Sequence, residues 1–170
     1  MYRKPRSYLI LGAILLLSTW FWQILKMDYY KSEQYYIDVV EQGITKALDN
    51  AEFDMIPVLD SVSTVDILAF SDYDFRTDNP FFIYRNGELK VWKDYSFAPD
   101  FAVLNRSDNV FVIQNKGGQF LVRKWHTDSR SGQYLVATLI PLSIDYQVQN
   151  RYLSDYSNAS IFRDVPVDIS

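Results

Sequence analysis

Residues 7–25 form an unbroken run without charge, dominated by Leu, Ile, Ala, Trp and Phe. In a helix, Ile10, Leu11 and residues 14–17 would cover every side of the cylinder, whereas a core helix keeps one polar face. Nineteen residues at the helical rise reach roughly 28 Å, which matches a hydrocarbon layer of about 30 Å. The run therefore predicts one transmembrane helix.

The residues on either side of this run predict its orientation in the membrane and whether it is cleaved. Arg3, Lys4 and Arg6 precede it, so the positive-inside rule keeps the N-terminus in the cytoplasm. A cleaved signal peptide is the alternative, but the run is long and ends in residues 19–22, Thr-Trp-Phe-Trp, where a peptidase requires small side chains. We expect an uncleaved anchor in a bacterial cytoplasmic membrane, with residues 1–25 as cytoplasmic tip and span and residues 26–170 as one extracytoplasmic domain.

The pattern after the anchor is helical at first. Residues 26–50 lack proline, and Tyr36, Val40 and Ile44 recur at helical spacing. We expect the membrane helix to continue outward through this segment as one rod. A second apolar stripe predicts another helix over residues 53–70 that packs back on the first, and residues 71–80 read as a loop.

After Pro80 the period changes to that of strands. Asn86-Gly87 between two apolar runs is a strong hairpin signal. A crossover at residues 93–109 has room for a helical turn at 101–104, and Pro141 is expected to end the last strand. The fold class is therefore α+β, with two helices on one face of a five-stranded antiparallel sheet. The expected strands are residues 81–84, 88–92, 110–114, 119–126 and 133–140.

Charge and composition exclude several classes of function. Three of the 17 Lys and Arg residues precede residue 7 and all 21 Asp and Glu residues follow residue 25, so residues 26–170 carry a net charge of −7. That argues against nucleic acid as a partner. The chain has no cysteine and one histidine, His126, without a nucleophile elbow or metal-ligand spacing. We expect no cofactor, no metal and no catalytic activity in these residues.

Four residues are candidates for ligand binding. Arg123 lies between apolar neighbours on a predicted strand, where its guanidinium could meet a ligand carboxylate. Trp92, Tyr95 and Trp125 could line a pocket between the sheet and the crossover. The alternatives favoured by the pattern are a surface or structural role for Arg123, paired with an acidic residue, and core packing for the aromatic residues.

Two motifs carry a resemblance to a known family. Residues 139–142, Leu-Ile-Pro-Leu, with Tyr146, Asn150 and residues 152–153, and the hairpin of residues 82–87 with Trp92, resemble the extracytoplasmic region of Bacteroidetes-type sensor histidine kinases. The resemblance implies a PAS-like or Cache-like sheet, with the first hairpin inserted centrally, that forms a ligand pocket. It also implies a two-component sensor that answers to a small molecule or a protein, with its kinase outside this chain, and dimerisation through the long N-terminal helix is expected.

Two other functions stay open. The chain could be a membrane-tethered binding or assembly protein without kinase output, or an enzyme that depends on His126. Residues 162–169 alternate like an unfinished strand, so we expect the natural chain to continue beyond Ser170.

Overall fold

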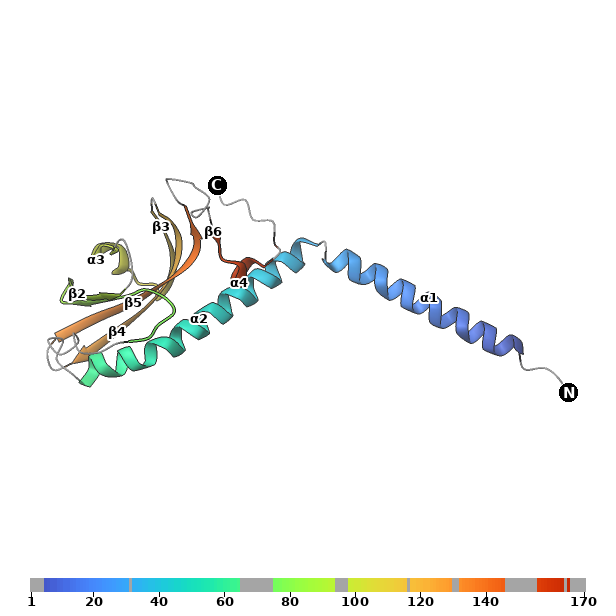
Figure 1. The fold of residues 1–170 in the computed structure, drawn as a ribbon, viewed down its shortest axis with the longest axis horizontal. Coiled ribbons are helices and arrows are strands. Elements are labelled where there is room, and N and C mark those ends of the chain that lie inside the picture. The colour runs from blue at the N-terminus through green and yellow to red at the C-terminus, as the bar shows by residue number, and fades with distance from the viewer. Residues whose placement is uncertain are drawn as a thin grey trace.

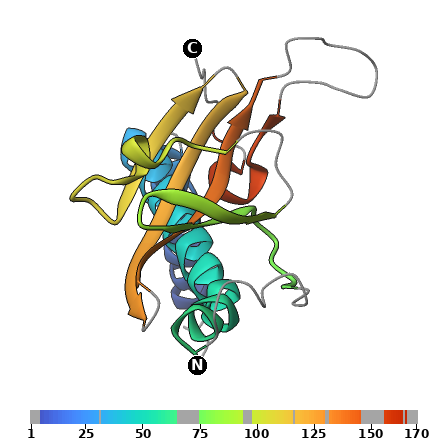
Figure 2. The ribbon, with the colours of Figure 1, turned by 90° about the vertical axis from the view of Figure 1, so that its left-hand side faces the viewer.

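The structure, a computed structural model, shows an α+β fold in which a long helix crosses one face of a twisted antiparallel sheet (Figure 1, Figure 2). A further helix, α1, extends away from this domain (Figure 1). The α+β class predicted from the sequence is thus confirmed. The residues described are 5–30, 32–64, 75–93, 98–115, 117–129, 132–145, 156–163 and 165.

The N-terminal rod is divided into α1, Pro5–Tyr30, and α2, Glu33–Thr64. Ser32 lies at the division, and both its hydroxyl and its carbonyl oxygen accept from the amide of Tyr35, at 3.2 and 3.1 Å. This is the geometry of a helix start, because a serine oxygen satisfies an amide that lacks a partner in the first turn. The prediction of one uninterrupted rod is therefore wrong at Ser32.

No helix within the described part of the chain combines the length and apolar character that crossing a bilayer requires. The span over residues 7–25 stays a prediction.

The prediction of a second helix packing back on the first is also wrong, because α2 continues through Pro57 to Thr64. Its buried stripe of Ala51, Met55, Val58 and Val62 keeps one phase along the helix. A turn near residue 52 would remove this stripe from the sheet, so burial of the stripe favours one continuous helix despite the proline. Residues 65–74, expected to finish that helix and begin the loop, lie outside the described residues.

All five predicted strands form, and the sheet runs in the order β2-β1-β5-β4-β3. The first hairpin turns at Asn86 and Gly87, whose φ angles of 51° and 84° are those of a tight hairpin turn. The hairpin is not inserted centrally, because β1 pairs with β5 while β2 forms an edge. A sixth strand, β6, pairs with β5. The strands are β1 Phe81–Arg85, β2 Glu88–Lys93, β3 Val110–Asn115, β4 Gly118–Ser129, β5 Gly132–Ile144 and β6 Tyr156–Ser157.

Contrary to expectation, Pro141 does not end β5, which continues to Ile144. Opposite Pro141 the register of β4 shifts between Gln119 and Phe120. On the other side, β1 pairs with β5 only as far as Thr138, so Pro141 lies where no β1 residue needs its missing amide hydrogen.

The sheet separates two apolar layers, and a third cluster joins its far end to α2. The α2 side contains Met55, Val58, Val62, Phe81, Ile83, Tyr134 and Val136. The opposite side, under the short helix α3, Phe101–Leu104, contains Phe82, Tyr84, Leu104, Ile113, Phe120, Val122, Leu135, Ala137 and Leu139. The third contains Ala51, Leu121, Ile140, Leu142 and Ile161, the last from α4, Ala159–Phe162.

Candidate functional site

The structure places Trp92 and Trp125 on opposite faces of the sheet. Trp92 pairs with Phe82, whose side chain belongs to the layer under α3, and it is 60% exposed. Trp125 packs instead on the layer that faces α2. The two tryptophans therefore cannot line one pocket between sheet and crossover, and Tyr95 lies outside the described residues.

Arg123 joins β4 to α2. Its Nη2 lies 3.2 Å from Oε2 of Glu52, and its guanidinium carbon lies 5.2 Å from the ring centroid of Trp125. Glu52 is on α2, so the pair and the stacked ring connect helix and sheet directly. This arrangement matches the structural alternative for Arg123, since both its charge and its planar face already have protein partners.

Lys124, which the sequence interpretation did not single out, is buried under α3 with 1% of its surface exposed. Its Nζ donates to the carbonyl oxygen of Leu104 at 2.9 Å and to that of Arg106, and lies 5.8 Å from the ring centroid of Phe111. Burial lowers the pKa of the ammonium group, while Asp108 opposes that effect. Its place among apolar residues in the strand alternation was the signal that could have revealed it.

Tyr84 forms a second polar contact between sheet and crossover. Its hydroxyl donates to the carbonyl oxygen of Pro99, and its ring lies 5.8 Å from that of Phe101. Burial, with a smaller contribution from Asp100, raises the pKa of Tyr84 to about 12. Lys124 and Tyr84 together fix the described part of the crossover to an otherwise apolar face.

A junction at the other end of the sheet links β5 to α2 through α4. Asn158 donates from Nδ2 to the carbonyl oxygen of Pro141 at 2.8 Å, and its Oδ1 accepts from the amide of Ser160 at 3.1 Å. The same side chain therefore holds the strand and begins α4. Ile161 then meets α2 at Gly43, where the backbones approach so closely that a β-carbon would not fit.

Beside this junction, a groove of about 580 Å³ follows the N-terminal half of α2. It continues the helix stripe that faces the sheet farther along, and Val165 from the C-terminal segment contributes to it. Apolar side chains that are only partly covered mark a contact surface. Its lining residues are Glu33, Tyr36, Ile37, Val40, Glu41, Ile44, Thr45 and Val165.

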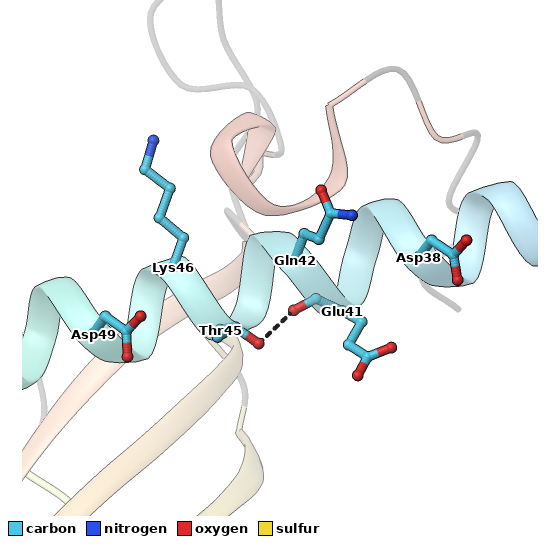
Figure 3. A pocket seen from close by; sticks show the side chains of 6 residues that line it. All are labelled: Asp38, Glu41, Gln42, Thr45, Lys46 and Asp49. Atoms are coloured by element: carbon cyan, nitrogen blue, oxygen red, sulfur yellow. Dashed lines mark hydrogen bonds between the residues drawn. The ribbon is translucent and has the colours of Figure 1, made fainter.

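The polar side of α2 carries a shallow hollow of about 460 Å³ whose side chains do not converge (Figure 3). Lys46 and Glu41 point in opposite directions, and the hydroxyl of Thr45 donates to the backbone oxygen of Glu41 at 2.9 Å (Figure 3). Within the described ranges, no group of three or more His, Cys, Asp or Glu residues could hold a metal ion.

No protein family, curated protein or solved structure matches this chain in the comparisons with known proteins.

Proposed function

We propose that this chain is the extracytoplasmic sensing module of a membrane-bound two-component histidine kinase, whose catalytic part lies outside these residues. In this proposal α1 spans the cytoplasmic membrane, the sheet domain receives a small-molecule or protein stimulus, and α2 carries the resulting movement to α1. The observation that carries the proposal is the position of α2, which belongs both to the core of the domain and to the segment leading to α1.

The two halves of α2 have different surroundings. Its C-terminal half buries Met55, Val58 and Val62 against the sheet, whereas its N-terminal half contacts α4 at Gly43 and carries the apolar groove. Its 32 residues extend about 48 Å at the helical rise. A rearrangement of the sheet or of α4 would therefore shift the end of α2 that adjoins α1. A stimulus acts through such a path only if it binds one arrangement better than the other.

The exposed side chains of α1 support a lipid environment. Leu15, Leu16 and Leu17 are 60%, 72% and 63% exposed, and as consecutive residues, about 100° apart around the helix, they point in different directions. Large apolar side chains on several sides of a projecting helix are costly in water and favourable in lipid. Trp20 and Trp22 would then occupy the interface, as tryptophan commonly does at a membrane surface.

The groove on α2 supports a homodimer as the signalling unit. Ile37, Val40 and Ile44 follow one another at intervals of three and four residues, the spacing of a two-helix seam. Ile37 is 50% exposed, so a second copy of α2 would cover an apolar surface that water now contacts. Parallel helices in a dimer can pack in two alternative arrangements, and a stimulus would stabilise one of them relative to the other.

The absence of cysteine makes the topology directly testable. The full chain would carry one cysteine at a time, Phe53→Cys on an exposed part of α2 or Tyr2→Cys at the N-terminus. We expect a membrane-impermeant maleimide to label the first variant in intact cells and the second only after permeabilisation. Labelling of Tyr2→Cys in intact cells, or release of the protein by a carbonate wash, would contradict the anchor and its orientation.

Single cysteines in the same cysteine-free chain also test whether two copies pair through α2. Ile37→Cys should form a disulfide between two copies in native membranes, whereas Phe53→Cys, which lies off the groove, serves as the matched control. Equal cross-linking of both variants would indicate random collision, and none at Ile37 would contradict the dimer. A tethered binding protein without output would keep its topology but show no dimer through this seam.

A further inference from the structure

β3 is an edge strand that offers its hydrogen-bonding groups outward. In the part of the chain that the structure describes, it pairs with β4 and with no other strand. The amide of Lys124 donates to the carbonyl oxygen of Asn109 at 3.0 Å, which fixes the alternation of this antiparallel pair. In such a pair, every second residue of β3 directs its backbone N–H and C=O groups away from β4. These residues are Val110, Val112 and Gln114.

Among the described residues, this edge lacks the charges, proline and bulges that usually prevent strand addition. Residues 110–115 contain no charge and no proline, and their register with β4 is unbroken. Val110 and Val112 are 38% and 50% exposed. The opposite edge, β2, is protected by Glu88 and Lys90 and by a register shift in its pairing with β1. Natural sheets protect edges with charges, proline and bulges. The β2 edge of this sheet has such protection, whereas the described residues of the β3 edge do not.

We propose that β3 binds an extended segment of another polypeptide, which adds a strand to the sheet. Backbone groups at residues 110, 112 and 114 would supply the hydrogen bonds, and alternate side chains of the segment would pack beside Val110 and Val112. Because β3 offers no charged side chain, the segment that fits is uncharged and rich in β-branched residues. The partner is thus a neutral, strand-forming peptide region of an exported or surface protein.

A second copy of this chain is the other occupant that the edge could take, and the membrane argues against it. Antiparallel pairing of two β3 strands is symmetric about an axis perpendicular to the sheet, which reverses every direction within the sheet plane. Since α2 runs along the sheet, the two copies would direct α1 to opposite sides (Figure 1). Two chains anchored in one bilayer cannot do so, and this choice of occupant rests on the proposed function.

Hydrogen exchange at single-residue resolution tests the proposal on the full chain in detergent micelles. The probe is a synthetic peptide of alternating Val and Thr with one Lys at each end, and a version with Pro at every second Val is the control. If the dissociation constant is about 0.1 mM, about 1 mM peptide slows exchange about tenfold. We expect this at the amides of Val112 and Gln114 with the first peptide only.

Two variants separate strand addition from other effects. Val112→Pro removes an outward amide hydrogen that β4 does not use, so the fold should survive while protection by the peptide is lost. Val112→Thr keeps the amide and should keep the protection, and Val112→Lys should weaken it. Absence of protection by the alternating peptide, or equal protection by the proline control, would overturn the proposal.

Protection that needs no peptide and increases with protein concentration would assign the edge to a second copy and also overturn it. Maleimide labelling tests the proposed topology independently of the peptide experiment. Labelling on the wrong side combined with peptide protection would leave strand addition standing and remove only the argument against self-pairing.

Discussion

Gly43 on α2 and Ile161 on α4 approach so closely that a β-carbon at residue 43 would lie 2.7 Å from the α-carbon of Ile161. The neighbour is backbone, which cannot rotate away as a side chain can. Glycine at this position therefore allows α4, and through Asn158 the end of β5, to contact the N-terminal half of α2. The contact links the far end of the sheet to the segment that leads to α1.

Gly43→Ala should displace α4 although alanine is the better helix former. Overpacking costs about 1–3 kcal/mol, against a propensity gain of about 1 kcal/mol. We expect faster hydrogen exchange at residues 159–162, measured on the full chain. Gly12→Ala is the matched control, because apart from its chain neighbours and the backbone of its own helix no atom of the described residues lies within 4 Å of a β-carbon there. Unchanged exchange in α4 for Gly43→Ala would show that the contact is looser than described.

Lys124→Met should release the crossover. The substitution keeps an apolar chain of similar length but removes the Lys124 donor from the carbonyl oxygen of Arg106 and leaves that of Leu104 with the amide of Arg106, which costs about 1–3 kcal/mol. Denaturant titration should show the lower unfolding free energy, and exchange should rise in α3. Lys90→Met on the edge strand β2 is the control and should change stability by less than about 0.5 kcal/mol. Equal effects of the two substitutions would contradict an anchoring role for Lys124.

The raised pKa of Tyr84 should make the folded chain less stable at alkaline pH. Its pKa in the folded chain is about 12, above the value of 10.0 for a free tyrosine. The folded state thus holds the proton more tightly than the unfolded state, which stabilises the fold. This contribution to the free energy of unfolding is complete below pH 10 and is lost as the pH rises toward 12. Its upper limit is about 2–3 kcal/mol.

The test compares the full chain with Tyr84→Phe between pH 9 and pH 12, a range set by the two pKa values of Tyr84. The difference in unfolding free energy should shrink as the pH rises. A constant difference for Tyr84→Phe would show that its hydroxyl is not buried.

The pair of Arg123 and Glu52 should contribute little to stability. Glu52 is more than half exposed, and exposed ion pairs contribute about 0.2–1 kcal/mol in double-mutant cycles. A cycle of Arg123→Gln and Glu52→Gln should therefore give a coupling energy below about 1 kcal/mol that decreases with added salt. A larger, salt-independent coupling would indicate that the pair is shielded from water.

Trp92 and Trp125 should respond differently to truncation. Trp125→Ala removes a ring from the layer against α2 and should cost about 2–4 kcal/mol. Trp92→Ala, on a side chain that is 60% exposed, should cost less than about 1 kcal/mol. Denaturant titration of both variants measures the difference. Similar costs would contradict their placement on opposite faces.

Local patterns were sufficient for the elements with strong local signals. Asn86-Gly87 specified the first hairpin because both residues accept positive φ angles. The break at Ser32 was missed because its neighbours on both sides favour helix. The continuity of α2 was missed because the apolar stripe from residue 53 was interpreted as a separate helix, whereas burial of Met55 and Val58 against the sheet favours one continuous helix.

The candidate site was less predictable, since it depends on which face of the sheet each neighbour covers. Arg123 and Trp125 were singled out from β4, but only the packing of α2 shows that both face Glu52 and not the crossover. Lys124 and Asn158 bind backbone oxygens of residues distant in sequence, and no spacing rule connects such partners.

By itself, the sequence determined the α+β class, the five main strands, the acidic balance of residues 26–170 and the uncharged run of residues 7–25, because each follows from the order of neighbouring side chains. Only the tertiary structure decided that β1 lies beside β5, that β3 is an edge among the described strands and that Gly43 contacts α4. These relationships join segments far apart in the chain, and burial of shared apolar surface, rather than local conformational preference, selects them.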